Sequence, residues 1–123
     1  MTKLITPLLM IARLLVAVQV VLGLAIWFGV ATITQLHIGL GSLFVLVMWI
    51  IALIALFALP KRTLPLLTLA LGGAIMWFGV AQRTLLVGPA HDAVRLAHLL
   101  LGISAMGLIE PMVKAMRRNN TAA

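Results

Sequence analysis

Two histidines occupy the same local pattern in the two halves of this 123-residue chain. Each is followed by a leucine three residues later and by a glycine four residues later. These residues are His37, Leu40 and Gly41 in the first half and His98, Leu101 and Gly102 in the second half. Residues three and four positions apart lie on one face of a helix. Imidazole nitrogens are common metal ligands, so the pattern predicts a pair of ligands that act together.

The elements that carry the histidines are predicted to be membrane-spanning helices. With 64% hydrophobic and only 9% charged residues, the chain has too little polar surface to cover a soluble core. A helix needs about 20 apolar residues to cross the hydrocarbon of a bilayer. Thr6-Pro7, Pro60 and Asp92 supply start and stop signals between the apolar runs. The expected helices are 7–30, 35–59, 64–84 and 92–117.

These helices predict an all-α integral membrane protein with one four-helix transmembrane domain, residues 1–118, and a disordered polar tail, residues 119–123. Thr34 is a candidate cap for the second helix. The chain has no cysteine, which excludes disulfides and thiolate metal sites.

An internal repeat relates the two halves, 7–59 and 64–117. Residues 23–31 match residues 73–81 at six of nine positions, including an unbroken Trp-Phe-Gly-Val-Ala. After an insertion of eleven residues in the second copy, the two histidines align. A parallel repeat implies a pseudo-twofold axis along the membrane normal. We therefore expect His37 and His98 at one depth on corresponding helix faces.

The basic residues predict the orientation. Seven of nine lie on the side of the termini, namely Lys3, Arg13, Lys61, Arg62, Lys114, Arg117 and Arg118. By the positive-inside rule this side is cytoplasmic, which predicts a multi-pass protein of the cytoplasmic (inner) membrane with its histidines near the outer face. Insertion and anionic headgroups account for most of the basic charge, so we do not expect nucleic acid as a partner.

A haem held between two helices satisfies these features best. Two histidines at equal depth can bind one iron from opposite sides. Gly41 and Gly102 lie one turn further along and leave room for the macrocycle. The expected apolar slot is lined by Leu40, Phe44, Leu101 and Ala105. Arg83 and Arg95, the two basic residues on the outer side, are the candidates for binding the propionates.

Other interpretations of the same residues remain open. A single histidine near a membrane interface is commonly a snorkelling polar residue, and helix glycines commonly serve packing. Zinc or copper needs a further ligand, and His91 is the available one. Glu110 is expected to pair with Lys114 one turn away, and a role in proton transfer is the alternative.

The architecture resembles one half of haem A synthase, with one histidine near the outer end of the second helix and another at the corresponding place in the fourth. The resemblance covers nearly the whole chain and implies binding of b-type or o-type haem by His37 and His98. In that family an acidic residue four positions before the first histidine is associated with oxidation of a haem methyl. This chain has Ile33 there and Val94 before His98, and it lacks the outer cysteine pair of many members.

The first hypothesis is therefore a protein with one bis-histidine haem b that acts in electron transfer or as a haem-carrying subunit of a respiratory or photosynthetic complex. Because the acidic residue is absent at Ile33, an enzyme is the less favoured interpretation. The expected partners are the lipid bilayer and other membrane subunits or a redox partner at the outer face. The alternatives are a haem-modifying or oxidase-assembly factor, a cofactor-free accessory subunit and a protein that binds chlorophyll-type pigments through single histidines.

Overall fold

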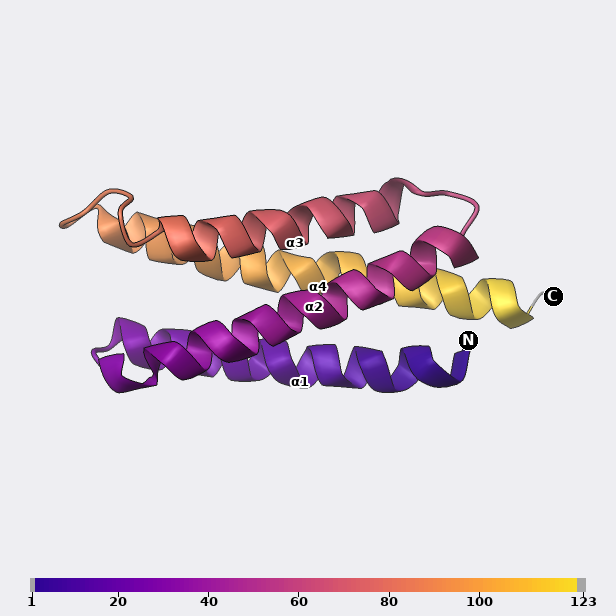
Figure 1. Ribbon diagram of the computed structural model, residues 1–123, viewed down its shortest axis with the longest axis horizontal. Coiled ribbons are helices and arrows are strands. Elements are labelled where there is room, and N and C mark those ends of the chain that lie inside the picture. Colours follow the sequence, from indigo (N-terminus) through magenta and orange to yellow (C-terminus); the bar gives the residue numbers. More distant parts are fainter. Residues whose placement is uncertain (1, 122–123) are drawn as a thin grey trace.

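The computed structural model describes residues 2–121, and the side chains of residues 4–119. Four α-helices make up most of this range (Figure 1). Their bounds are α1 Thr2–Trp27, α2 Thr34–Ala58, α3 Thr63–Ala81 and α4 His91–Thr121, and a short 3₁₀ turn, η1 Ala31–Ile33, precedes α2. The prediction of an all-helical fold with four long helices is confirmed.

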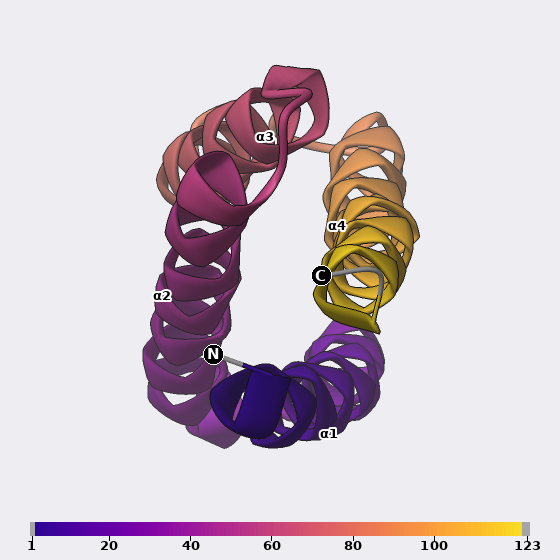
Figure 2. The same ribbon diagram turned by 90° about the vertical axis from the view of Figure 1, so that its right-hand side faces the viewer.

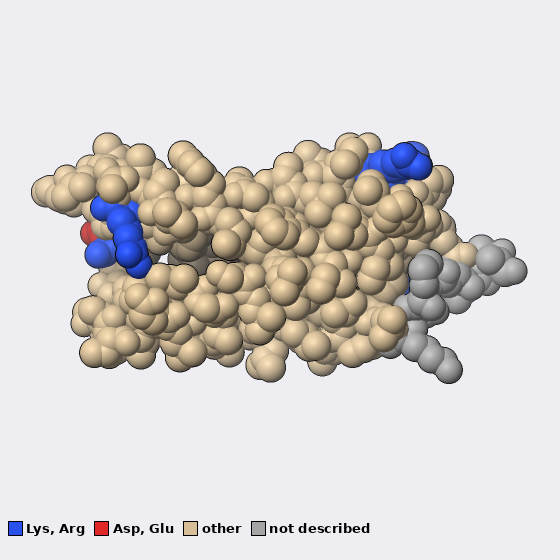
Figure 3. Space-filling view, viewed as in Figure 1, with Lys and Arg blue, Asp and Glu red and all other residues tan. Residues whose placement is uncertain are grey.

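All four helices are long and apolar enough to cross a membrane. The candidate spans are Leu4–Trp27, Ala31–Ala58, Thr63–Ala81 and His91–Asn119. We call the end that holds both described chain ends and the connection 59–62 the terminal end, and the end that holds the connections 28–33 and 82–90 the histidine end (Figure 1). On the face drawn in Figure 3, the coloured charged side chains gather at these two ends. This distribution suits helices that cross an apolar layer.

The helices follow one another around a ring, as the view along the bundle shows (Figure 2). Each helix contacts its neighbour in sequence, and α1 closes the ring against α4. Across the ring α2 also contacts α4, whereas α1 and α3 make no contact with each other within residues 2–121. The two helices that carry the histidines are therefore the pair that meets across the bundle.

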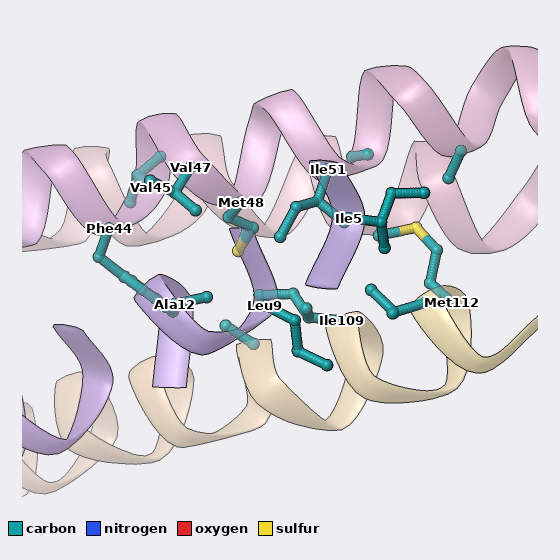
Figure 4. Packing of buried hydrophobic residues seen from close by; sticks show 14 of the residues in the cluster. Ile5, Leu9, Ala12, Phe44, Val45, Val47, Met48, Ile51, Ile109 and Met112 are labelled. Atoms are coloured by element: carbon teal, nitrogen blue, oxygen red, sulfur yellow. The ribbon is translucent and has the colours of Figure 1, made fainter. Parts of the chain in front are cut away.

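The buried core lies mainly toward the terminal end. Side chains from α1, α2 and α4 point toward one another there, and Figure 4 labels them as Ile5, Leu9, Ala12, Phe44, Val45, Val47, Met48, Ile51, Ile109 and Met112. Ile5, Met48, Ile51 and Ile109 are fully buried. This half of the bundle is closely packed, which leaves the histidine end as the half with room for a cavity.

The first helix begins earlier than predicted, at Thr2 instead of residue 7, and Pro7 lies inside it. At the sixth position of a helix, proline removes one backbone hydrogen bond and its ring crowds the carbonyl four residues earlier. Burial of the Ile5 side chain in the core compensates for this loss. The start signal at Thr6-Pro7 was therefore overridden by packing.

The first helix ends at Trp27 instead of residue 30, because Gly29 has a φ of 106°. The Gly29 N–H donates to Ile26 at 3.0 Å and the Val30 N–H to Ala25 at 3.0 Å, which is the Schellman arrangement. Thr34 is the first residue of α2 but not its cap, because its hydroxyl donates to the Ala31 carbonyl at 2.7 Å.

The third helix stops at Ala81, three residues before the predicted end, because the Thr84 hydroxyl binds the Ala81 carbonyl at 2.9 Å and the chain leaves helical geometry at Leu86 and Gly88. α2 ends and α4 begins within one residue of prediction. The predicted disordered tail is wrong for residues 119–121, which continue α4. The basic side chain of Arg118 in the last turn favours this continuation. Residues 122–123 lie outside the described range.

The repeated pentapeptide adopts two conformations. In the first copy it straddles the end of α1, whereas in the second copy all five residues, 77–81, are helical. In the second copy α3 continues to Ala81, which aligns with Ala31, whereas α1 already ends at Trp27. The two halves therefore share sequence without sharing the local geometry of Gly29 and Gly79.

The contact between α2 and α3 depends on a glycine. The Trp49 indole N–H donates to the Leu69 carbonyl at 3.1 Å, and a Cβ at Gly72 would overlap the indole ring. The neighbouring Gly73 has open space around its Cα. Close approach of the indole to the α3 backbone therefore requires glycine at position 72.

We predict that Gly72→Ala lowers the free energy of unfolding by about 1–3 kcal/mol relative to Gly73→Ala. Both changes gain the same helix propensity, so their difference isolates the overlap with Trp49. Thermal or denaturant unfolding of the purified protein in detergent measures it. Equal stability of the two variants would show that Trp49 can move aside.

Candidate functional site: two histidines at a cavity

The two predicted histidines lie together in space. His37 is in the first turn of α2 and His98 is two turns into α4. Their ring centres are 6.2 Å apart and their ring planes form an angle of 62°. The contact between α2 and α4 across the ring brings them together although they are 61 residues apart in the sequence.

Each imidazole packs against a glycine of the preceding helix. A Cβ on Gly23 of α1 would lie 3.4 Å from Cε1 of His37, and one on Gly79 of α3 would lie 3.5 Å from Cε1 of His98. The sequence analysis did not assign these glycines to the site. In the repeat Gly23 aligns with Gly73, and Gly79 aligns with Gly29. Gly73 and Gly29 lie in open space, so the alignment alone did not identify Gly23 and Gly79 as site residues.

The two histidines have different ring neighbours. Phe78 stacks on His98, with ring centres 6.0 Å apart and planes within 9° of parallel. His37 is held instead through its backbone, because the Gln19 side-chain amide donates to the His37 carbonyl at 3.0 Å. Phe78 and Gln19 are further residues that position the pair and that sequence reasoning did not place there.

The Nδ1 atoms of both rings are buried and have no hydrogen-bond partner. Among the described side chains, no other buried nitrogen or oxygen atom lacks a hydrogen-bond partner. Buried polar atoms in folded proteins are nearly always paired, and an unpaired one requires an explanation. The pair is therefore not explained as a structural hydrogen-bonding network.

A cavity of about 510 Å³ opens at the histidine end and is lined by both histidines. Its walls come from all four helices and are mostly apolar. Figure 3 shows the opening beside the arginine side chains at this end. No Asp or Glu of the described residues lines this cavity.

Seven of the ten predicted site residues line the cavity: His37, His98, Gly41, Gly102, Phe44, Arg83 and Arg95. The other three, Leu40, Leu101 and Ala105, do not line this cavity. Ala105 is fully buried in the core, and Leu40 and Leu101 pack against that core. They share a helix face with the histidines, but that face passes from the cavity into the packed half of the bundle.

The two glycines below the histidines differ in their surroundings. Gly102 has open space where a Cβ would be, as expected for a residue that leaves volume for a ligand. At Gly41 a Cβ would lie 3.5 Å from the Gln19 side-chain oxygen. Gly41 thus makes room for the Gln19 amide as well as for the cavity.

The predicted arginines lie at the cavity mouth, where a second pocket of about 270 Å³ adjoins them. Arg95 bonds Asp92 at 3.1 Å across one turn of α4. Arg83 has no hydrogen-bond or ion-pair partner among the described side chains. Its guanidinium is free to bind an anionic group of a ligand in the cavity.

The structure does not favour a multi-ligand metal site. No group of three or more His, Cys, Asp or Glu side chains within residues 4–119 is arranged to hold a metal ion. His91 begins α4, and its Nδ1 lies 3.1 Å from the Leu85 carbonyl, which ties the ring to the preceding loop. His91 lines the same cavity as the pair, but among the described residues the three histidines do not form a group that could hold a metal ion.

Comparison of the chain with protein-family models, with curated proteins and with solved structures found no match to any of them.

We predict that Gln19→Leu destabilises the protein by about 0.5–1.5 kcal/mol, because it removes the hydrogen bond from α1 to the His37 carbonyl. Gln82→Leu is the matched control. Gln82 also lines the cavity, but its amide bonds only to the Gly79 carbonyl three residues earlier, at 3.3 Å. Unfolding in detergent measures both, and equal losses would contradict a special role for Gln19.

Proposed function

We propose that this chain is a membrane haem protein in which His37 and His98 bind the iron of one b-type haem from opposite sides. Its role is electron transfer, alone or as the haem-carrying subunit of a larger respiratory or photosynthetic membrane complex. The observation that carries the proposal is the 6.2 Å separation of the two ring centres.

That separation fits a shared metal. Metal–nitrogen bonds to histidine are about 2 Å long, and a ring nitrogen lies about 1.1 Å from the ring centre, so two imidazoles in line on one metal have centres roughly 6 Å apart. The same spacing is ordinary for two rings in edge-to-face contact, so the buried Nδ1 atoms without a partner are what favour a shared ligand over packing alone.

The cavity suits the rest of the cofactor. Its volume of about 510 Å³ lies in the range of about 300–1,000 Å³ that is common for small-molecule and cofactor sites. Its apolar walls suit a macrocycle, and Gly102 leaves free volume beside His98. The unpaired Arg83 and its neighbour Arg95 at the mouth are suited to bind the two propionates.

The residues around the histidines favour electron transfer over substrate oxidation. A bound haem would supply a one-electron couple between ferric and ferrous iron. Two histidine ligands leave no free iron position. The family resemblance implies an acidic group for haem modification. This chain has Ile33 and Val94 at those positions, and none of the described residues that line the cavity is Asp or Glu.

The distribution of basic residues supports an orientation with the terminal end in the cytoplasm. The cavity mouth would then face the outer side of the cytoplasmic membrane. A redox partner would approach there, near Arg83 and Arg95.

We predict that His37→Ala and His98→Ala each abolish binding of low-spin haem, because the surviving histidine of the pair supplies only one of the two bonds to the iron. His91→Ala keeps normal haem content, since His91 is bonded to the Leu85 carbonyl outside the pair. The measurement is haem stoichiometry together with the reduced-minus-oxidised absorption spectrum. A His37→Ala protein with an unchanged spectrum would refute the shared-ligand proposal.

We also predict that Arg83→Gln lowers the midpoint potential of the haem. Removing a nearby cation makes the additional electron of ferrous haem less favourable, and a partly solvated pair is worth about 1 kcal/mol, or on the order of 40 mV for one electron. Arg62→Gln is the control, because Arg62 lies at the opposite end of the bundle. Potentiometric titration decides the matter, and a larger shift for Arg62→Gln would place the haem at the other end.

A further inference from the structure

An ion pair lies on the outer surface of the bundle, inside the apolar spans. Arg13 of α1 bonds Glu110 of α4 through two contacts, Nε to Oε1 at 2.6 Å and Nη2 to Oε2 at 2.9 Å. The two side chains remain 49% and 41% exposed. The pair therefore joins the α1–α4 seam but is not enclosed by it.

The pair lies well away from the membrane surface expected for the terminal end. Arg117 donates to the Thr6 hydroxyl at 3.1 Å, so these two side chains meet near the terminal end. Arg13 is seven residues from Thr6, and Glu110 is seven residues from Arg117. At 1.5 Å per residue, each partner of the ion pair is about 10 Å deeper.

At that depth the pair has hydrogen-bonding capacity that lipid tails cannot satisfy. A guanidinium has five N–H donors and a carboxylate has about four acceptor positions, of which the contacts within the pair use two each. The charge of Arg117 also acts on Glu110 from two turns further along α4. The closest additional contact of Arg13 Nη1 is the Met10 sulfur at 3.8 Å, a weak acceptor. Ionisable residues in membrane spans are costly and generally face protein.

We propose that this face, defined by Met10, Arg13, Ala17, Ile103, Gly107 and Glu110, is the contact surface of a homodimer. In a twofold dimer the same surface meets itself. Two Arg–Glu pairs then lie antiparallel, so the unused donors of one Arg13 meet the unused acceptors of the partner's Glu110. A second copy of this chain is therefore the occupant whose charges are complementary by symmetry.

The neighbouring residues allow a close approach. Gly107 is exposed, and the position of its missing Cβ has open space around it. Ala17, one turn beyond Arg13 on α1, is also small and exposed. Small residues at helix contacts let two backbones approach closely enough for interhelical hydrogen bonds. The inference needs only that the helices span a membrane, so it is independent of haem binding.

Single-cysteine cross-linking tests the location of the contact, because the chain has no native cysteine. We expect Ala17→Cys to form a disulfide-linked dimer on oxidation in the membrane. Ala74→Cys is the matched control: it is the same substitution at an exposed position of α3, which does not contact α1 within the described residues. Cross-linking of Ala17→Cys no greater than that of Ala74→Cys would overturn the proposal.

Neutralising the pair tests the role of charge. In the Ala17→Cys background, Arg13→Gln with Glu110→Gln should weaken association about tenfold, which corresponds to about 1.4 kcal/mol.

Native mass spectrometry of the unaltered protein should show two chains. A single chain with bound phospholipid would mean that lipid headgroups occupy the face, and undiminished cross-linking of the neutralised variant would mean that other contacts hold the dimer; either result contradicts the proposal. Loss of haem in any variant would not affect this readout.

Discussion

The approach of two unpaired imidazoles in an apolar environment is the constraint on which the site depends. Each Nδ1 is buried without a partner, and the rings are 6.2 Å apart beside a cavity. A buried polar group without a hydrogen bond costs about 1–3 kcal/mol, so two such groups are a substantial cost for a small bundle. A ligand that binds both histidines and fills the cavity would recover this cost through metal bonds and apolar contacts.

The division of the bundle into two halves makes this arrangement stable. Toward the terminal end, side chains such as Ile5, Met48 and Ile109 are fully buried and hold α1, α2 and α4 together. Toward the histidine end, the same helices and α3 separate around the cavity. Close packing in one half thus supplies the rigidity that fixes the positions of His37 and His98 in the other half.

The fold could be predicted from apolar periodicity and start and stop signals, because a spanning helix must satisfy all its backbone groups internally. Most of the site also followed, since the repeat paired His37 with His98. What the sequence could not supply was the relative position of helices distant in sequence. The histidine rings pack against Gly23 and Gly79, and Glu110 pairs with Arg13 instead of Lys114. Both features depend on contacts between helices that no local sequence pattern encodes.

Electron paramagnetic resonance of the oxidised, purified protein tests the central claim most directly. The account predicts one haem per chain with a low-spin ferric signal. A protein purified without haem, or with only high-spin haem that lacks a second strong ligand, would contradict the claim that His37 and His98 share one iron.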